Sequence, residues 1–87
     1  MATLLKTTGE KIYLKPRRHK FSLEELQKAV GGEVDYLSAG PTHFMCVDAH
    51  AKVKGLPANK NATDIIRQFG GPTIVGDAVF LEKRDII

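Results

Sequence analysis

Amide, hydroxyl and cationic side chains gather around the loop at residues 55–61 and the helix that we expect after it. The first turn of a helix presents unpaired backbone N–H groups and partial positive charge, so it can receive a phosphate or a carboxylate. Arg67 lies one turn beyond Thr63 on the same side of that helix and could reach the same anion. The sequence therefore predicts a ligand-binding site for a small anion. Its candidate residues are Lys54, Asn59, Lys60, Asn61, Thr63 and Arg67.

An ordinary capped helix beside a solvated loop explains the same residues, because asparagine is a routine residue at the start of a helix. The loop also lacks the glycine spacing of a phosphate-binding loop. The sequence alone therefore does not decide between an anion-binding site and an ordinary helix cap.

A second cationic segment, at residues 15–20, connects an expected strand to the first expected helix. If this connector lies against DNA or RNA, its charges release counterions and make binding strongly salt-dependent. Lys11 extends this run of cations toward the N-terminus, and Tyr13, between Lys11 and Lys15, is the one aromatic residue interleaved. A single-strand platform usually offers several exposed rings. The alternative prediction is a nucleic-acid site, and a solvated connector is the simpler explanation of the same residues. Its candidate residues are Lys15, Arg17, Arg18 and Lys20.

Cys46, with His43, Asp48 and His50 close in sequence, is the one group that suggests metal binding or covalent chemistry. On a regular strand at most three of these four side chains share a face. A cysteine within an apolar strand is commonly inert, and no pair of carboxylates has a placement fixed by periodicity. We therefore expect no catalytic residue, no metal and no cofactor.

The composition is that of an ordinary globular protein. The chain has 87 residues, of which 43% are hydrophobic and 26% charged, with a net charge of +3. This length suits a single domain over residues 1–87, and no segment approaches the roughly 18–20 apolar residues that cross a bilayer. One cysteine excludes an internal disulfide and fits a reducing compartment. We therefore expect a cytoplasmic protein, and the positive charge favours anionic partners.

The first helix has the clearest local signals. Ser22 and Glu25 have the spacing of a capping box, and Phe21 and Leu26 have the spacing of a hydrophobic staple. Two glycines at 31–32 supply a left-handed end. The pattern predicts a helix from 23 to 30.

The other elements follow from alternation and turn residues. We expect a hairpin at 3–15, strands at 33–38 and 42–47, and a short extended piece at 52–54. A second helix should follow, capped by Asn61 and with an apolar stripe that runs through Phe69. The last strand should span 73–83, with a bend at 76–77. The strand at 42–47 is apolar at nearly every position, which predicts a central strand covered on both faces.

The order of elements is ββαββαβ, which predicts an α+β fold. We expect a small, largely antiparallel sheet of four to five strands with two helices packed on one face. An exposed sheet edge beside the apolar tail Ile86-Ile87 offers a route to a homo-oligomer.

Four short segments carry a resemblance to a known family. They are LQKAVGG at Leu26–Gly32, KGLPAN at Lys54–Asn59, Ala62-Thr63, and IVGD at Ile74–Asp77. Their order and spacing resemble a family of short phage-, plasmid- and bacterium-encoded domains of unknown function, over residues 12–83. Glu33 stands where the family has an aromatic or β-branched residue. The resemblance implies a small accessory protein of a mobile genetic element and carries over no catalytic residues.

These observations predict a non-enzymatic small binding protein of a phage or mobile element that sequesters an anionic nucleotide-like ligand and thereby counters a host process. Two alternatives stay open. One is a nucleic-acid-associated accessory protein that uses the basic connector, and the other is a blocker of a host protein through a sheet edge. In each case the expected location is the host cytoplasm.

Overall fold

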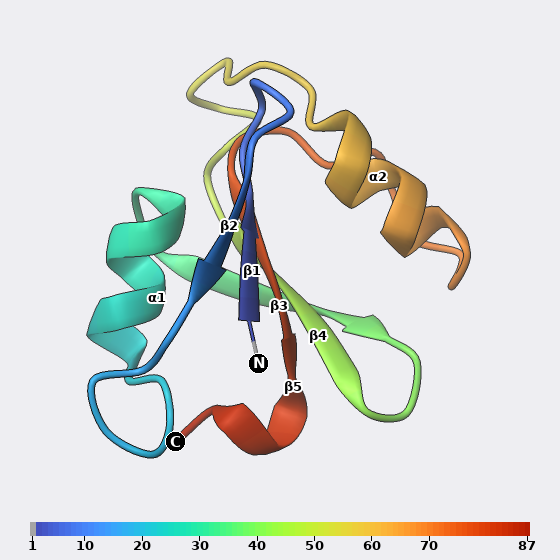
Figure 1. Ribbon diagram of the computed structural model, residues 1–87. Helices are drawn as coiled ribbons and strands as arrows, with labels where there is room; N and C mark the ends of the chain where they lie inside the picture. Colours follow the sequence, from blue (N-terminus) through green and yellow to red (C-terminus); the bar gives the residue numbers. More distant parts are fainter. Residues whose placement is uncertain (1) are drawn as a thin grey trace.

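A computed structural model describes residues 2–87 as one five-stranded sheet with two helices (Figure 1). The elements are β1 (Ala2–Leu5), β2 (Lys11–Leu14), α1 (Leu23–Val30), β3 (Val34–Ala39), β4 (His43–Asp48), α2 (Lys60–Arg67), β5 (Ala78–Glu82) and a 3₁₀ turn (Lys83–Asp85). Every strand pair is antiparallel and the strand order is β2-β1-β5-β4-β3. The predicted α+β class, element order and antiparallel sheet are therefore confirmed.

The last strand of the chain, β5, lies at the centre of the sheet. Val79 on β5 pairs with Leu4 of β1 on one side and with Cys46 of β4 on the other. The hairpins β1–β2 and β3–β4 therefore become one sheet only when β5 inserts between them, so most of the fold depends on contacts between distant parts of the sequence.

The two helices lie on opposite faces of the sheet (Figure 1). Leu26 and Val30 of α1 pack in one core with Cys46 of β4, whereas Ile66 of α2 packs in a second core with Met45 of β4. The prediction that both helices pack on one face is therefore wrong. The physical reason was present in the sequence, because a central strand that is apolar on both faces needs cover on both faces.

The capping box at the start of α1 is confirmed. The Ser22 hydroxyl accepts a hydrogen bond from the Glu25 N–H (3.2 Å), and the Glu25 carboxylate accepts one from the Ser22 N–H (3.1 Å). At the other end Gly31 adopts φ +88°, a left-handed conformation that glycine accommodates without strain. The helix bounds therefore agree with those expected from the sequence.

The region around α2 differs from the expectation in four respects. The cap is Asn59 and not Asn61, so the helix begins at Lys60. Phe69 follows the helix end and is 50% exposed. Residues 52–54 form a turn, and the last strand begins at 78 and not 73. The cause of the last difference is a pairing of Ala58 with Val75, which bends the chain back toward the loop before α2.

Both lateral edges of the sheet, β2 and β3, are free among the described residues. The C-terminal segment instead docks on its own chain, where Ile86 pairs in parallel with Phe21 and the Ile87 N–H donates to the Phe21 carbonyl (3.1 Å). The predicted homo-oligomer and the predicted block of a host protein through a sheet edge both stay predictions.

Each helix is too small to cover its face. An eight-residue helix is about 12 Å long, whereas five strands spaced by about 4.8 Å make a sheet roughly 20–25 Å wide. Helix α1 lies against β3, β4 and β5. It therefore leaves the same face of β1 and β2 without a helix above it.

Because the sheet separates the two cores, truncation of a buried side chain in either core should destabilise the protein by itself. Leu26→Ala and Ile66→Ala should each lower the free energy of unfolding by about 2–5 kcal/mol, since both side chains are fully buried. Urea unfolding followed by circular dichroism measures the loss. Leu23→Ala is the control, because its side chain is 54% exposed and its loss should stay below about 1 kcal/mol. A Leu26→Ala loss as small as that of the control would contradict the packing of α1.

Candidate functional site

The side chain of Asn59 is fully buried and hydrogen bonded at both ends. Its Oδ1 accepts from the Ala62 N–H (3.1 Å), and its Nδ2 donates to the carbonyls of Leu5 (2.8 Å) and Gly76 (2.9 Å). Asn59 therefore caps α2 and also ties it to β1 and to the loop before β5. Its polar atoms are occupied within the protein.

Thr63 is bound in a similar way. Its hydroxyl accepts from the Ile74 N–H (2.9 Å) and lies 3.3 Å from the Ile74 carbonyl, to which it donates. Its own N–H bonds the Asn59 carbonyl (3.0 Å), as expected in a first helical turn. The polar atoms of both side chains, Asn59 and Thr63, are therefore hydrogen bonded to backbone groups of the protein itself.

The cations of the first predicted site are not gathered at the start of α2. Lys54 Nζ lies 2.6 Å from Asp48 Oδ2 and 3.1 Å from the Gly31 carbonyl, at the end of α1. Lys60 pairs with Asp64 across one turn of α2 (2.9 Å). Asn61 lies 3.4 Å from the Gly9 carbonyl, and Arg67 is exposed. Ligand binding by these six residues stays a prediction, while their observed partners belong to the fold.

The carboxylate of Asp48 is almost entirely buried beside Lys54, with 1% of its side chain exposed. Burial alone would raise the pKa of this carboxyl, but the hydrogen bonds from Lys54 and from the His50 N–H outweigh it and hold the pKa below its usual value. Gly32 makes room for the pair, because a Cβ there would lie 2.7 Å from Lys54 Nζ. The ion pair therefore joins the end of α1 to the turn after β4.

Cys46 lies in the core on the α1 side of the sheet, with none of its surface exposed. Burial raises the pKa of its thiol to about 12, so the reactive thiolate is disfavoured at neutral pH. Within residues 2–87, no three His, Cys, Asp or Glu side chains are placed to hold a metal ion. His50 reaches Glu33 and lies apart from the thiol (His50 Nε2 to Glu33 Oε2, 3.4 Å).

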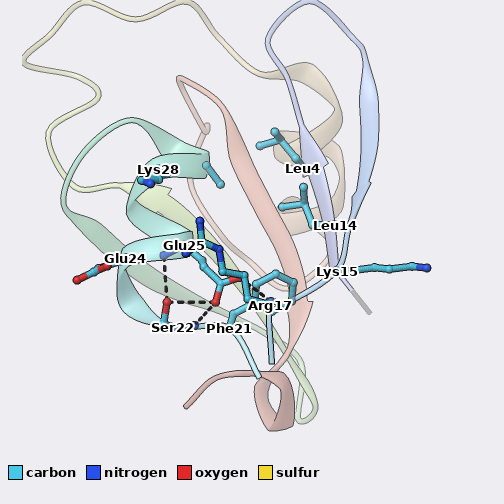
Figure 2. Close-up of a pocket in the computed structure, with 10 residues that line it drawn as sticks. Leu4, Leu14, Lys15, Arg17, Phe21, Ser22, Glu24, Glu25 and Lys28 are labelled. Carbon is cyan, nitrogen blue, oxygen red and sulfur yellow. Dashed lines mark hydrogen bonds between the residues drawn. The ribbon is translucent and has the colours of Figure 1, made fainter. Parts of the chain in front are cut away.

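A hollow of about 410 Å³ lies between α1 and β2, and we call it the α1–β2 groove (Figure 2). It occupies the part of the sheet face that α1 leaves uncovered. Its apolar lining consists of Leu4, Leu14, Phe21 and Ala29. Its charged and polar lining consists of Lys15, Arg17, Ser22, Glu24, Glu25 and Lys28.

Glu25 holds the chain segment that forms one wall of the groove, from Arg17 to Ser22, against α1. Its carboxylate accepts from the N–H groups of Ser22 and Arg17 (3.1 Å each). These two backbone hydrogen bonds, led by that from Ser22, lower the pKa of Glu25. One acidic side chain therefore caps α1 and holds the cationic connector against it.

The positive charges around this groove have few partners. Among residues 2–87, Arg17 and Lys28 have no carboxylate within ion-pair distance, and the same holds for Arg18 and Lys20 of the connector. Figure 2 shows the Arg17 side chain running along α1 toward Lys28, whereas Lys15 points away from the groove. Arg17 and Lys28 therefore form no ion pair, whereas Lys54 and Lys60 of the first predicted set are each paired with a carboxylate.

Three of the four residues of the second predicted set lie together, because Arg17, Arg18 and Lys20 border a hollow of about 240 Å³ beside Ile87. Arg17 also lines the α1–β2 groove, as does Lys15. Nucleic-acid binding by these residues stays a prediction. Sequence reasoning missed Leu4, Leu14 and Lys28. Lys28 lies on the polar side of an amphipathic helix, but nothing in the sequence indicated that α1 would stop short of β2.

None of the helices within residues 2–87 has the length and apolar character needed to span a membrane.

Asn59→Ala should lower the free energy of unfolding by about 2–4 kcal/mol, because it removes a helix cap and leaves two buried carbonyls without a donor. Asn59→Asp keeps the cap but directs a carboxylate at those carbonyls, so it should be at least as damaging. Urea unfolding measures both. Asn61→Ala is the matched control and should change stability by less than about 0.5 kcal/mol. Equal effects at 59 and 61 would contradict the assigned cap.

Asp48→Asn should reduce stability by about 1–3 kcal/mol at pH 7. The folded-state pKa of Asp48 is lowered, so its contribution is present above the unfolded-state pKa near 3.9 and is lost as the pH falls through the folded-state value. The difference between wild type and variant should therefore shrink as the pH falls below that unfolded-state value, as measured by urea unfolding across pH. Asp64→Asn, which breaks an exposed pair, should cost about 0.5 kcal/mol. A difference that does not change with pH would contradict the ion pair.

Comparison with known proteins agrees with the resemblance seen in the sequence at the level of the family. Residues 1–86 match the family described as Domain of unknown function (DUF3846). No curated protein and no solved structure gives a significant match to the chain. The family description states no ligand, partner or reaction. Because the match covers nearly the whole chain, the protein belongs to this DUF3846 family of domains of unknown function.

Proposed function

We propose that this domain is a non-enzymatic binding protein that takes up a small anionic, nucleotide-like ligand in the α1–β2 groove. One observation carries the proposal: a hollow of about 410 Å³ combines an apolar floor with two cations, Arg17 and Lys28, that form no ion pair within residues 2–87. Small-molecule sites usually have volumes of roughly 300–1,000 Å³ and an apolar lining with a few polar groups. The groove fits that description for a ligand of mononucleotide size.

The apolar part of such a ligand would lie on the sheet. Leu4 and Leu14 stand on neighbouring strands and are only partly buried by the chain itself. Figure 2 shows both side chains on the sheet side of the groove, facing α1. A planar ring placed against them would remove apolar surface from water, and each 100 Å² so covered contributes roughly 2.5 kcal/mol.

The anionic part would be bound at the connector. The guanidinium of Arg17 can donate two parallel hydrogen bonds to a phosphate, and Lys28 supplies a second positive charge. The Arg17 backbone is already held by Glu25 (3.1 Å). Less conformational freedom is therefore lost when its side chain binds a phosphate.

The proposal is for binding and not catalysis because the acid and the hydroxyl in the groove are committed to structure. Glu25 is hydrogen bonded by Ser22 and Arg17, and the Ser22 hydroxyl donates to Glu25 (3.1 Å). Neither group has a histidine partner among the hydrogen bonds of residues 2–87. A nucleophile or a general base needs such activation.

The biological setting in this proposal comes from the resemblance to proteins of phages and plasmids. A small binding protein of a mobile genetic element acts in the cytoplasm of its host. By sequestering a nucleotide-like signal there, it would counter a host process without altering the signal chemically.

Thermal unfolding in the presence of mono-, di- and cyclic nucleotides, and of inorganic phosphate, tests the proposal. A ligand at ten times its Kd adds about 1.4 kcal/mol to the stability of the folded state. For a domain of this size that raises Tm by roughly 5–10 °C. The variant Arg17→Ala/Lys28→Ala should lose most of this shift.

The control is Lys52→Ala/Arg67→Ala, which removes the same number of positive charges away from the groove and should retain the shift. Loss of the shift in the control, with retention in Arg17→Ala/Lys28→Ala, would move the site to the α2 region. No shift of the wild-type protein with any nucleotide at millimolar concentration would remove the proposal.

A further inference from the structure

The opposite face of the sheet, on which α2 packs, carries a second uncovered area beside β2. Lys11 and Tyr13 alternate along β2, so they share a face, and the pairing of Lys11 with Leu5 places them on the α2 side. Lys15 follows the end of β2 and borders the α1–β2 groove, but its side chain points away from that groove (Figure 2). Tyr13 is 75% exposed, and Lys11 and Lys15 are exposed as well. A ring flanked by two cations is therefore open to a partner on this side.

Two more rings stand on the same face, and both are only partly exposed, because they stack on each other and Phe80 also packs against the core beneath α2. Phe80 lies on β5 and His43 on β4, and their rings are stacked with centroids 4.8 Å apart and planes 12° from parallel. The strand register aligns Tyr13 with Thr3 and Thr3 with Phe80. The three strands thus carry a ring, a hydroxyl and a ring in one row, and two strand spacings put the outer two roughly 10 Å apart.

We propose that this row binds single-stranded nucleic acid, with one base stacked on Tyr13 and another on the His43–Phe80 pair. Bases stack on aromatic side chains whatever their sequence, because every base has a π-face. An antiparallel sheet with exposed rings on neighbouring strands is an arrangement that proteins use to bind single strands. The edge of this surface is positively charged and therefore complementary to a phosphate backbone. Lys11 and Lys15 lie there, beside the Tyr13 ring, where the phosphates of a bound strand would run.

A duplex does not fit this surface. Its bases are stacked on one another and offer no π-face to a tyrosine, and a flat sheet face cannot enter the major groove as a helix does. Glu82, the acidic residue of β5 on this face, pairs with Arg84 (2.9 Å) and so repels a backbone less. The surface therefore discriminates between single and double strands.

This inference goes beyond the proposed function, because it concerns the other face of the sheet and uses different residues. The α1–β2 groove relies on Arg17 and Lys28, whereas this surface relies on Tyr13, Lys11 and Lys15. Either can fail without the other.

Fluorescence anisotropy with labelled dT12, U12 and a 12-base-pair duplex, in 50 mM salt, tests the inference. The wild-type protein should bind a single strand more tightly than the duplex, and tighter binding of U12 or of dT12 identifies RNA or DNA as the preferred strand. Tyr13→Ala should weaken single-strand binding by about tenfold to a hundredfold, while Tyr13→Phe should stay within about twofold of wild type because it retains the ring. Lys11→Ala/Lys15→Ala should weaken binding and lower the slope of log K against log salt by about 1.4.

The control is Arg17→Ala/Lys28→Ala, which removes the same charge from the opposite face and should retain single-strand binding within about threefold. The inference is overturned if neither oligonucleotide binds the wild-type protein, if the duplex binds equally well, or if Tyr13→Ala binds like wild type. A loss in Arg17→Ala/Lys28→Ala as large as that in Lys11→Ala/Lys15→Ala also overturns it, because net charge alone would then explain binding.

Discussion

Two eight-residue helices cannot cover both faces of a five-stranded sheet, and the surface of this protein follows from that constraint. The central strands β4 and β5 are apolar on both sides, with Met45, Cys46, Val79 and Leu81 fully buried. Each face therefore requires a helix, and the chain supplies one to each. The strands farther from each helix stay partly open, and the α1–β2 groove is the open part on the side of α1.

The buried polar groups of this fold serve its assembly. Asn59 joins α2 to β1 and to the loop before β5, Thr63 joins α2 to Ile74, and the Lys54–Asp48 pair joins the turn after β4 to the end of α1. Asp77 accepts a hydrogen bond from the Thr7 N–H (2.9 Å) at the tip of the first hairpin. Five of these residues, Lys54, Asn59, Thr63, Ile74 and Asp77, come from the short segments that carried the resemblance to a family. Their shared physical role is to hold irregular loops against the sheet, because buried polar groups in loops need partners.

The helices and strands were largely predictable because their signals are local, whereas the placement of the helices on the two faces depends on distant contacts. The capping box of Ser22 and Glu25, the glycine after Val30 and the apolar run of β4 each fix an element from a few neighbouring residues. The cap of α2 was misplaced by two residues, since Asn59 and Asn61 look equivalent in the sequence. What distinguishes them is the pair of carbonyls on Leu5 and Gly76, which come from distant parts of the chain.

The sites were less predictable for the same reason. Lys54 and Lys60 looked available in the sequence, but carboxylates brought by the fold and by the helix turn neutralise them. Arg17 was assigned to a nucleic-acid connector, and its place beside α1 depends on the Glu25 carboxylate. Charge without a partner is a property of the folded surface, so it could not be read from composition or from spacing along the chain.

The most direct test of this account is a titration of the ¹⁵N-labelled protein with 5′-AMP, followed by amide chemical shifts. If the uncovered part of the sheet beside α1 is the site, the shifts should move at Leu14, Arg17 and Lys28 and change little at residues 60–63. Changes concentrated at residues 60–63, with a silent groove, would contradict the account and return the site to the start of α2.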